Sequence, residues 1–469
     1  MLARAISKTK FEDPRQDEGG LASVDTSVIF EQLVHKYKAR TRPIEVDFRE
    51  LVQWVRVGDQ QTHLLHPYPA KLLPHIAHFF VRATTLVKPK TVVLDPFCGS
   101  GTVALETSLA GCTPYVADAN PMALLIARVK TTPYAPDELK AYAAKILASA
   151  RRLRTAPTVE IVNEHLWYAP EKKARLEILL RAIRENAPAQ LLDFFLVCFS
   201  VLARKISYAD PRISVPVRLR DKEAYSDPVR DRILERLAWL DSVDPLSEYS
   251  KICEWNIERV EVANTTNPKR KPALVVGSDA RKLRSPDATF SKQLPAGSVP
   301  FIITSPPYGS AQKYIRATSL SLNWLGMASP AKLKSLEAQS IGREHLPGTS
   351  EIAYEDLTSD LRSQIKRIEK ANPLRARITF TYLQEMRSTL AELARVCARG
   401  GRITLIVGNN QVAGQLVRND KYFTEFLIEQ GLELELSMLD DIKSRGLMTK
   451  RNRTASVISR ESVLVFYKK

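Results

Sequence analysis

Short runs of apolar residues, many of them β-branched, alternate along much of the chain with segments of helical apolar spacing. The runs are typical of buried strands, and we expect seven of them, at residues 91–94, 114–117, 273–276, 299–303, 402–407, 433–436 and 462–466. Helical spacing predicts helices at 74–85, 102–110, 122–130 and 381–398. Strands and helices that alternate in this way predict an α/β fold with an open, mostly parallel sheet.

Three parts of the chain depart from this alternation. Residues 136–260 are mostly helical in pattern, with helices expected at 137–153, 170–185 and 191–202. Residues 1–45 are polar and mixed in charge, and a long polar stretch covers 309–375. We therefore expect four segments: a partly flexible N-terminal arm (1–60), the first part of the sheet domain (61–135), a helical insertion (136–264) and the second part of the sheet domain (265–469).

Composition narrows the class of protein. With 469 residues, 44% hydrophobic and 26% charged, the chain is long enough for a sizeable core. The formal net charge of +17 suits a polyanionic partner. Five cysteines without metal-ligand spacing indicate neither a disulfide framework nor a zinc site, so no metal is expected. No run reaches the ~18 apolar residues of a membrane span, and no signal peptide begins the chain. We expect a cytoplasmic protein without a membrane partner.

The turn from the first predicted strand into a helix carries a candidate cofactor site. It reads Asp95-Pro96-Phe97-Cys98-Gly99-Ser100-Gly101-Thr102. Gly99 and Gly101 allow the backbone to approach a ligand closely, and the helix that starts at Thr102 offers unpaired N–H groups. The third glycine of a dinucleotide fingerprint and the Lys of a phosphate loop are both missing. A nucleoside-like cofactor without a pyrophosphate cradle is therefore expected.

Two further acids follow the next predicted strands. Asp118 ends the second strand, where a carboxylate can accept hydrogen bonds from ribose hydroxyls. Asp279 ends the third, where a carboxylate can accept from an adenine amino group. Either acid by itself is more often a helix cap or a turn residue. Their order on successive strands, after the glycine turn, favours a cofactor site.

The fourth predicted strand ends in a candidate catalytic turn, Thr304-Ser305-Pro306-Pro307-Tyr308. Two prolines fix the backbone and remove donors, so the Pro306 carbonyl can point outward as an acceptor. The Ser305 hydroxyl is a second acceptor. Together they can hold the hydrogens of an amino group and direct its lone pair at a methyl donor, while Tyr308 offers a face for an extruded base. A plain Pro-Pro turn is the alternative interpretation.

These motifs resemble the amino-methyltransferases that act on cytosine N4 or adenine N6 of DNA. Asp95 to Thr102 is similar to that family's first cofactor motif, and His66 to Lys71 to its other cofactor-side motif. The resemblance covers about 61–135 and 270–469 and includes Gly400-Gly401 and the terminal strand from Glu461 to Phe466. It implies S-adenosylmethionine as the cofactor and a Rossmann-like, seven-stranded class I methyltransferase sheet. The implied cofactor residues are Tyr68, Pro69, Ala70, Lys71, Asp95, Pro96, Phe97, Cys98, Gly99, Gly101, Thr102, Asp118, Ala119, Asn120, Asp279 and Ala280.

The resemblance also implies a reaction. Ser305 before Pro306-Pro307-Tyr308 resembles the cytosine-N4 members, whereas Asp or Asn there usually marks adenine N6. Direct transfer to a flipped-out base, without a covalent enzyme intermediate, is expected, and no Pro-Cys pair suggests a cysteine nucleophile. An adenine-N6 enzyme, an RNA base amino-methyltransferase and an inactive nucleic-acid-binding module stay open as alternatives.

The target-recognition region does not occupy either of the family's usual positions. Residues 136–264 and 309–375 are the two candidates, and we expect the insertion to read most of the bases. Double-stranded DNA is the expected partner, and a cognate restriction endonuclease stays open. Basic residues expected to contact DNA are Lys313, Arg316, Arg204, Lys205, Lys450, Arg451 and Arg453.

Overall fold

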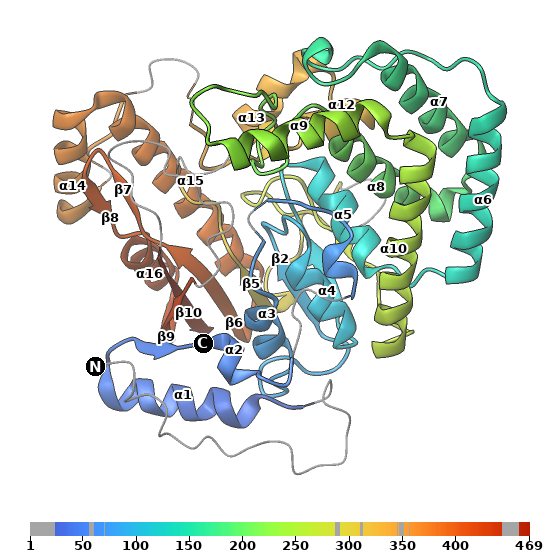
Figure 1. The fold of residues 1–469 in the computed structure, drawn as a ribbon. Coiled ribbons are helices and arrows are strands. Elements are labelled where there is room, and N and C mark those ends of the chain that lie inside the picture. Colours follow the sequence, from blue (N-terminus) through green and yellow to red (C-terminus); the bar gives the residue numbers. More distant parts are fainter. Residues whose placement is uncertain are drawn as a thin grey trace.

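A large, mostly parallel sheet forms the centre of the protein, as its pattern predicts (Figure 1). The computed structural model describes residues 24–55, 61–69, 71–286, 291–309, 313–344, 346, 351–355, 357–442 and 459–469. Across these residues the sheet has eight strands in the order β1-β9-β10-β6-β5-β2-β3-β4. Only β10 runs antiparallel to its two neighbours. The strands are β1 (Ile44–Val46), β2 (Val92–Asp95), β3 (Thr113–Val116), β4 (Leu274–Val275), β5 (Val299–Thr304), β6 (Cys397–Gly408), β9 (Leu432–Asp441) and β10 (Arg460–Lys468).

The eighth strand comes from the predicted N-terminal arm, which the structure corrects for residues 24–55. β1 pairs in parallel with β9, with Ile44 opposite Met438. Helices α1 (Ser27–Arg40) and α2 (Phe48–Leu51) flank it, and Phe30 and Phe48 pack against Phe80 of the sheet domain. The few apolar residues of this segment are separated by many charged ones, so no strand or helix was evident from the pattern. Residues 24–55 therefore belong to the sheet domain.

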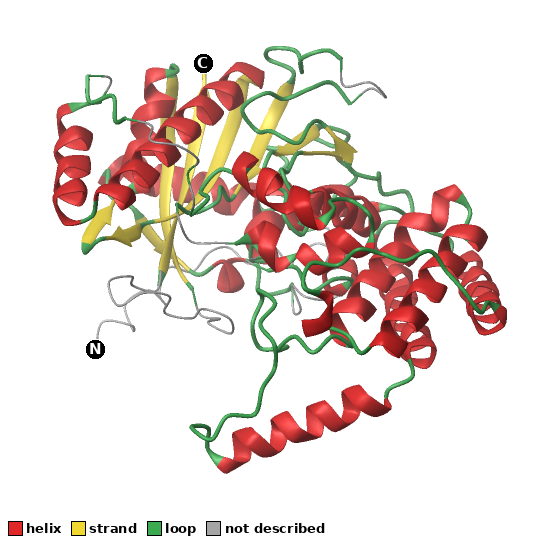
Figure 2. Cartoon of the chain, turned by 90° about the horizontal axis from the view of Figure 1, so that it is seen from above, coloured by secondary structure: helices red, strands yellow, loops and turns green. Residues whose placement is uncertain are grey.

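The helices pack on both faces of the sheet and in a separate helical body on one side (Figures 1 and 2). Around the sheet lie α3 (Pro74–Val81), α4 (Thr102–Leu109), α5 (Pro121–Thr131), α14 (Ser359–Ala371), α15 (Pro373–Val396) and α16 (Asn419–Glu429). The helical body contains α6 (Pro136–Arg152), α7 (Pro170–Asn186), α8 (Ala189–Lys205), α9 (Asp227–Ser242) and α10 (Pro245–Thr266). Shorter elements are η3 (Gln61–Leu64), η4 (Glu164–Leu166), η5 (Pro330–Lys332) and the hairpin β7 (Asn410–Val412) and β8 (Gln415–Val417).

The polar stretch after β5 is more ordered than its pattern indicates. It contains α11 (Tyr314–Ala317), α12 (Ser319–Trp324) and α13 (Leu333–Gln339), and it leads into α14 and the early start of α15. Asn372 caps α15 through a side-chain hydrogen bond from Arg375 N, and Pro373 occupies the first turn. These short amphipathic elements were hidden by the many polar residues around them.

Alternate residues of the central strands enter different cores. Val93 and Phe301 face the core formed with α1, α2 and α3, whereas Leu94 and Ile302 face the core formed with α15 and α16. β2 and β5 are neighbours in register, with Val93 opposite Phe301. Burial of both faces explains why these strands are continuous apolar runs.

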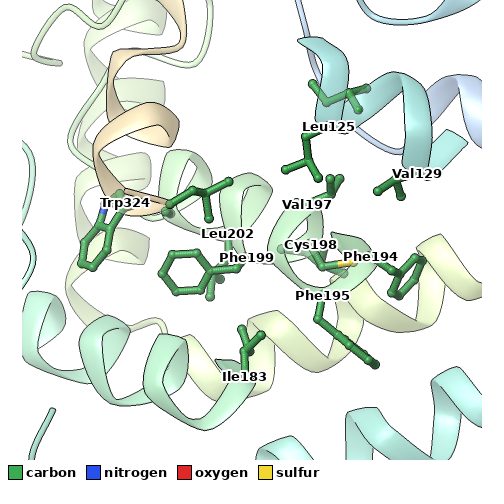
Figure 3. Packing of buried hydrophobic residues seen from close by; sticks show 14 of the residues in the cluster. Leu125, Val129, Ile183, Phe194, Phe195, Val197, Cys198, Phe199, Leu202 and Trp324 are labelled. Atoms are coloured by element: carbon green, nitrogen blue, oxygen red, sulfur yellow. The ribbon is translucent and has the colours of Figure 1, made fainter. Parts of the chain in front are cut away.

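The helical insertion shares its core with the sheet domain. Phe194, Phe199 and Leu202 of α8 pack with Leu125 and Val129 of α5 in one buried cluster, and Trp324 of α12 joins them (Figure 3). Burying side chains of this size contributes on the order of 1.5–3 kcal/mol each. Removing residues 136–264 would therefore expose the core of the sheet domain, so the insertion is not an independent module.

The strand order reverses between β2 and β5, because the chain continues from β2 toward β3 on one side and from β5 toward β6 on the other. Ligands of open α/β sheets bind beyond the carboxyl ends of the strands at such a point. Asp95 ends β2, and Thr304 ends β5. The fold thus brings the two motifs of the sequence to one place.

Candidate functional site

The two motif turns are joined directly by a buried hydrogen bond. The hydroxyl Oγ1 of Thr304 donates to Oδ1 of Asp95 over 2.6 Å, and Phe97 N donates to the same oxygen over 3.1 Å. Both residues are almost completely buried. Burial raises the pKa of Asp95 to about 7, although the bond from Thr304 opposes this shift. The carboxyl group therefore fixes the end of β5 relative to the glycine turn.

The glycine turn packs closely against α5. Gly101 has a φ of +73° at the N-cap of α4, and a Cβ there would lie 2.8 Å from Ala127 Cα. Gly99 has a φ of +46° and donates its N–H to Asp118 Oδ2 over 2.9 Å. Both positions favour glycine because of backbone conformation, and Gly101 also lacks space for a side chain.

Asp118 follows β3 and organises the second part of the candidate cofactor site. Its Oδ1 accepts from Asn120 N over 2.8 Å, so both carboxylate oxygens contact backbone N–H groups. Each oxygen keeps acceptor capacity for a further donor. Burial raises the pKa of Asp118 to about 6. The side chain is half-buried and so is accessible to a ligand.

Asn120 connects three segments around this point. Its Nδ2 donates to Tyr68 Oη over 3.1 Å and to Thr318 Oγ1 over 3.0 Å, and its Oδ1 accepts from Met122 N. Tyr68 is buried, and its Cε1 atom would lie 3.6 Å from a Cβ at Gly99. The upstream motif with Tyr68 and the segment after β5 with Thr318 therefore meet at Asn120.

Asp279 lies beyond β4 and belongs to an ionic network. Arg281 donates from its backbone N and from Nε to Asp279 Oδ1, over 2.9 and 2.8 Å. The side chain of Asp279 is 36% exposed. Arg281 therefore engages Oδ1 of this predicted cofactor acid. Among the described residues, no donor forms a hydrogen bond with Oδ2.

The Ser-Pro-Pro-Tyr turn (Ser305–Tyr308) is held by residues from three later elements. Tyr382 of α15 donates its hydroxyl to the Pro307 carbonyl over 2.8 Å. Asn410 Nδ2 at β7 donates to the Gly309 carbonyl over 3.2 Å. Tyr308 donates its hydroxyl to Glu461 Oε1 of β10. Backbone and ring are therefore fixed from the side of α15 and β10.

A fourth tyrosine, Tyr314, is within electrostatic reach of the three already described. Burial raises the pKa values of Tyr68, Tyr308 and Tyr382, and the nearby hydroxyl of Tyr314 raises each of them further. Tyr314 begins α11, shortly after the Ser-Pro-Pro-Tyr turn. Tyr314 therefore interacts electrostatically with tyrosines on both the cofactor side and the Ser-Pro-Pro-Tyr side of the site.

Cys98 lies in the glycine turn but has the environment of a packed thiol. It is buried, and burial raises its pKa, with Asp118 and Asp95 adding to the effect. A thiol with a raised pKa is a poor nucleophile at neutral pH. This environment is consistent with packing as the role of Cys98.

The remaining predicted cofactor residues lie around this centre. Pro96 and Ala280 are buried, while Pro69, Phe97 and Ala119 are partly exposed. Lys71 Nζ donates to the His63 carbonyl over 3.1 Å. Thr102 is buried at the start of α4. Ala70 lies outside the described residues.

The basic residues predicted to contact DNA differ widely in their surroundings. Arg204 donates to the carbonyls of Asp210 and Ile213, and burial lowers its pKa. Lys205 forms an ion pair with Glu248 and lies 5.2 Å from the Trp255 ring centroid. Both residues therefore have contacts within the helical body, and their contact with DNA stays a prediction.

Of the two basic residues near the Ser-Pro-Pro-Tyr turn, one is exposed and the other is partly buried. Arg316 is exposed on α11, whereas Lys313 forms an ion pair with Glu344 over 2.9 Å. The three basic residues near the C-terminus, Lys450, Arg451 and Arg453, lie outside the described residues.

Among residues that the structure does describe, no group of three or more His, Cys, Asp or Glu is placed to hold a metal ion. No helix in that part of the chain is long and apolar enough to cross a membrane.

Sequence reasoning missed most of the residues that hold the site together. They are Thr318, Arg281, Arg343, Tyr382, Glu385 and Asn410. One signal was present: Tyr382 and Glu385 are three residues apart in a predicted helix, so they share a face. The carbonyl or acid with which each of these residues pairs is determined by the tertiary fold, and no local sequence pattern indicates it.

The comparisons with known proteins agree with the class of site that this geometry indicates. A family model described as "RMKL-like, methyltransferase domain" matches residues 65–166, which include the glycine turn, Asp118 and Asn120. This region of the chain is thus similar to a methyltransferase domain, and methyltransferase is the class of enzyme that the similarities support.

Two relatives in sequence are named methyltransferases. The chain is 22% identical over 420 residues to the type II methyltransferase M.MvaI of Kocuria varians, covering 84% of this chain and 87% of that protein. It is 32% identical over 81 residues to the type II methyltransferase M.MjaII of Methanocaldococcus jannaschii, covering 17% of this chain and 15% of that protein. Among solved structures, the rRNA methyltransferase aviRa of Streptomyces viridochromogenes aligns with a TM-score of 0.25 at 11% identity, over 85% of this chain and 87% of that one.

Proposed function

We propose that this chain transfers a methyl group from S-adenosylmethionine to the exocyclic N4 amino group of cytosine in a flipped-out base of double-stranded DNA. One observation carries the proposal. The Ser-Pro-Pro-Tyr turn ends β5 and is bonded, through Thr304 and Asp95, to the glycine turn that ends β2. An amino group held at the Ser-Pro-Pro-Tyr turn would therefore face a ligand held at the glycine turn.

The residues on the glycine side fit the proposed cofactor. Three carboxylates, Asp95, Asp118 and Asp279, follow neighbouring strands, and such acceptors suit a ligand with an ammonium group, ribose hydroxyls and an adenine amino group. Gly99 keeps the backbone beside Tyr68 free of a side chain. When bound, S-adenosylmethionine supplies an electrophilic methyl group on a positively charged sulfur.

The Ser-Pro-Pro-Tyr turn can orient the target amino group through two acceptors. Tyr382 already occupies the Pro307 carbonyl, while no donor among the described residues contacts the Pro306 carbonyl. Pro306 O and Ser305 Oγ would each accept one amino hydrogen and direct the nitrogen lone pair away from the turn. Held in this way, the nitrogen would be placed to take the methyl group that the bound cofactor would supply, with S-adenosylhomocysteine leaving, and it would then release one proton. Positioning of this kind accounts for several kcal/mol of a reaction barrier.

Tyr308 would receive the extruded base. Its hydroxyl is held by Glu461, so the ring has a defined orientation before a base arrives. Stacking on an aromatic face offsets part of the unstacking cost of a flipped base. Tyr314, which lies within electrostatic reach of the Tyr308 hydroxyl, is suitably placed to line the same space.

DNA as the substrate is supported by charge and by the relatives. The net charge of +17 suits a polyphosphate, and both curated relatives are named type II methyltransferases. Exposed Arg316 follows the Ser-Pro-Pro-Tyr turn and is proposed to contact the backbone near the flipped base. The helical body would read the sequence, and a cognate restriction endonuclease is a further proposed partner.

Mass spectrometry of nucleosides tests this proposal directly. DNA from cells expressing the protein should contain N4-methylcytosine, and DNA from cells expressing Ser305→Ala should not. N6-methyladenine instead would overturn the choice of base. Methylated RNA with unmodified DNA would overturn the DNA substrate. Unmodified nucleic acids, together with no binding of S-adenosylhomocysteine in calorimetry, would indicate an inactive module.

A further inference from the structure

Four alternating charges connect the cofactor side of the site to a distant part of the chain. Arg281, already bonded to Asp279, donates from Nη1 to Glu385 Oε1 over 3.0 Å. Arg343 donates from Nη1 to both oxygens of Glu385, over 2.7 and 3.0 Å. The side chains of Glu385 and Arg343 are only 14% and 12% exposed. Water therefore screens these two groups far less than it screens a surface ion pair.

Arg343 belongs to a segment that packs on the Ser-Pro-Pro-Tyr turn. This return segment, Ile341–Glu344, follows α13. Gly342, with a φ of +78°, passes so close that a Cβ there would lie 3.0 Å from the Tyr308 carbonyl oxygen. Glu344 pairs with Lys313, just after the turn, over 2.9 Å. The chain leaves the Ser-Pro-Pro-Tyr turn after Tyr308, and at the return segment it contacts that turn again.

Glu385 lies on a helix that also contacts the turn itself. Tyr382, three residues earlier on α15, donates to the Pro307 carbonyl. The two side chains share one face of the helix. One surface of α15 therefore contacts the Ser-Pro-Pro-Tyr turn, the return segment and Arg281.

We propose that Glu385 is a positioning residue that couples the Asp279 side of the cofactor site to the return segment on the target side. This inference rests on the proposed function, because it takes Asp279 as a cofactor acid. A ligand that engages the second oxygen of Asp279 fixes Asp279 and hence Arg281. Arg281 then holds Glu385, which in turn holds Arg343 and the return segment against the Ser-Pro-Pro-Tyr turn.

Without Glu385, two guanidinium groups would face each other in a partly buried space. Their repulsion would displace Arg343 or Arg281, and the return segment would lose its link to Asp279. Coupling between two ligands is reciprocal. Cofactor binding should therefore strengthen DNA binding, and DNA binding should strengthen cofactor binding by the same factor.

Binding measurements with S-adenosylhomocysteine and a DNA duplex test this coupling. The Kd of the duplex is measured with and without S-adenosylhomocysteine, using a duplex that the wild-type protein methylates. In the wild type, the cofactor product should tighten duplex binding by at least about fivefold. Arg343→Met should reduce this factor to near one and change the affinity of the free protein for S-adenosylhomocysteine less than about twofold. Glu385→Gln should lose the same factor and also raise the KM for S-adenosylmethionine.

Hydrogen exchange gives a readout that does not depend on DNA. S-adenosylhomocysteine should slow exchange in the return segment of the wild type and leave it unchanged in Glu385→Gln. Arg387→Met is a matched control, because Arg387 lies on the same helix but pairs with Glu429. It should keep both the coupling factor and the exchange protection.

Two results would contradict the inference in different ways from a failure of the proposed function. Wild-type coupling in Arg343→Met, or protection retained in Glu385→Gln, would show that the network does not link the two sides. A wild-type protein that binds no S-adenosylhomocysteine would instead refute the proposed function itself.

Discussion

Apart from the bond between Thr304 and Asp95 that joins the two motif turns, the carboxylates of Asp95 and Asp118 are held by neighbouring residues, whereas the Ser-Pro-Pro-Tyr turn is held by distant ones. Asp95 and Asp118 each accept from an N–H two residues later, and Asp118 also accepts from Gly99. Pro307 depends on Tyr382, and Tyr308 depends on Glu461, which is 153 positions away. The first arrangement forms within one strand–helix–strand unit. The second requires the whole sheet.

Because of this difference, substitutions on the cofactor side and substitutions around the Ser-Pro-Pro-Tyr turn should have different effects. A change on the cofactor side should act on ligand binding, because its hydrogen bonds survive in local structure. A change in the residues that hold the Ser-Pro-Pro-Tyr turn should act on turnover, because only the geometry of the turn shifts. The following predictions test that separation, and all of them take the proposed function as their basis.

Removal of the Ser305 hydroxyl should have the largest effect on turnover. Ser305→Ala deletes one of the two proposed acceptors for the amino group, so kcat should fall by about 100-fold or more. The Kd for S-adenosylhomocysteine should stay within about twofold, because no cofactor contact is removed. Single-turnover kinetics and calorimetry measure the two quantities. A loss of cofactor affinity equal to the loss of turnover would contradict the separation.

Removal of the Asp118 carboxylate should have the opposite profile. Asp118→Ala deletes the proposed acceptor for ribose and releases Gly99 N and Asn120 N. Hydrogen bonds to charged groups contribute roughly 1.5–3 kcal/mol, so the cofactor Kd should rise about 10- to 100-fold. Calorimetry measures this change. Asp118→Asn, which keeps an acceptor, should lose less affinity, and equal losses in both variants would argue against a hydrogen-bonding role.

Cofactor affinity should also depend on pH. Burial raises the pKa values of Asp95 to about 7 and Asp118 to about 6, so both are largely protonated at pH 5.5. A ligand with an ammonium group and hydroxyl donors favours the ionised forms, so its binding releases protons at low pH. Affinity for S-adenosylhomocysteine should therefore rise about tenfold from pH 5.5 to pH 8 and then level off. In Asp95→Asn the rise should be smaller, and an unchanged rise would exclude Asp95 as its source.

Loss of the Tyr382 hydroxyl should have the smallest effect. Tyr382→Phe keeps the ring in the core and removes only the donor to the Pro307 carbonyl. A hydrogen bond of this kind contributes about 1 kcal/mol, so kcat should fall roughly three- to tenfold, with cofactor affinity unchanged. Steady-state kinetics measures kcat, and the melting temperature reports on folding. A Phe variant with wild-type kcat would show that the turn keeps its geometry without this bond.

The same difference explains what could be predicted from the sequence. The strand that ends at Asp95 and the turn through Gly101 are local patterns, because strand, glycines and helix start are adjacent in the chain. The predicted large, mostly parallel sheet is confirmed in its general form. The predicted count of seven strands is not confirmed. The sheet has an eighth strand, β1, which pairs with β9 almost 400 residues away.

Long-range pairing also explains the residues that were missed. Nothing around Asn410 or Glu385 indicates that their partners are Gly309 or Arg343, since those pairs form only after β5, β6 and α15 pack together. Arg204 shows the converse case, a charged side chain whose partners lie within the fold. Its position in a basic segment predicted a DNA contact, but the loop that follows α8 folds back and presents two carbonyls to it. Charge in a sequence does not reveal which cations the fold itself uses.

β1 has a practical consequence for how this protein can be shortened. The three-residue strand covers the edge of β9, and α1 packs beside it. A fragment that began at residue 61 would uncover Met438–Asp440 of β9 and leave the backbone groups that pair with β1 without partners, beside an opened apolar face. Such an edge is a template for pairing with another chain, so this fragment should aggregate even though both motif turns are intact.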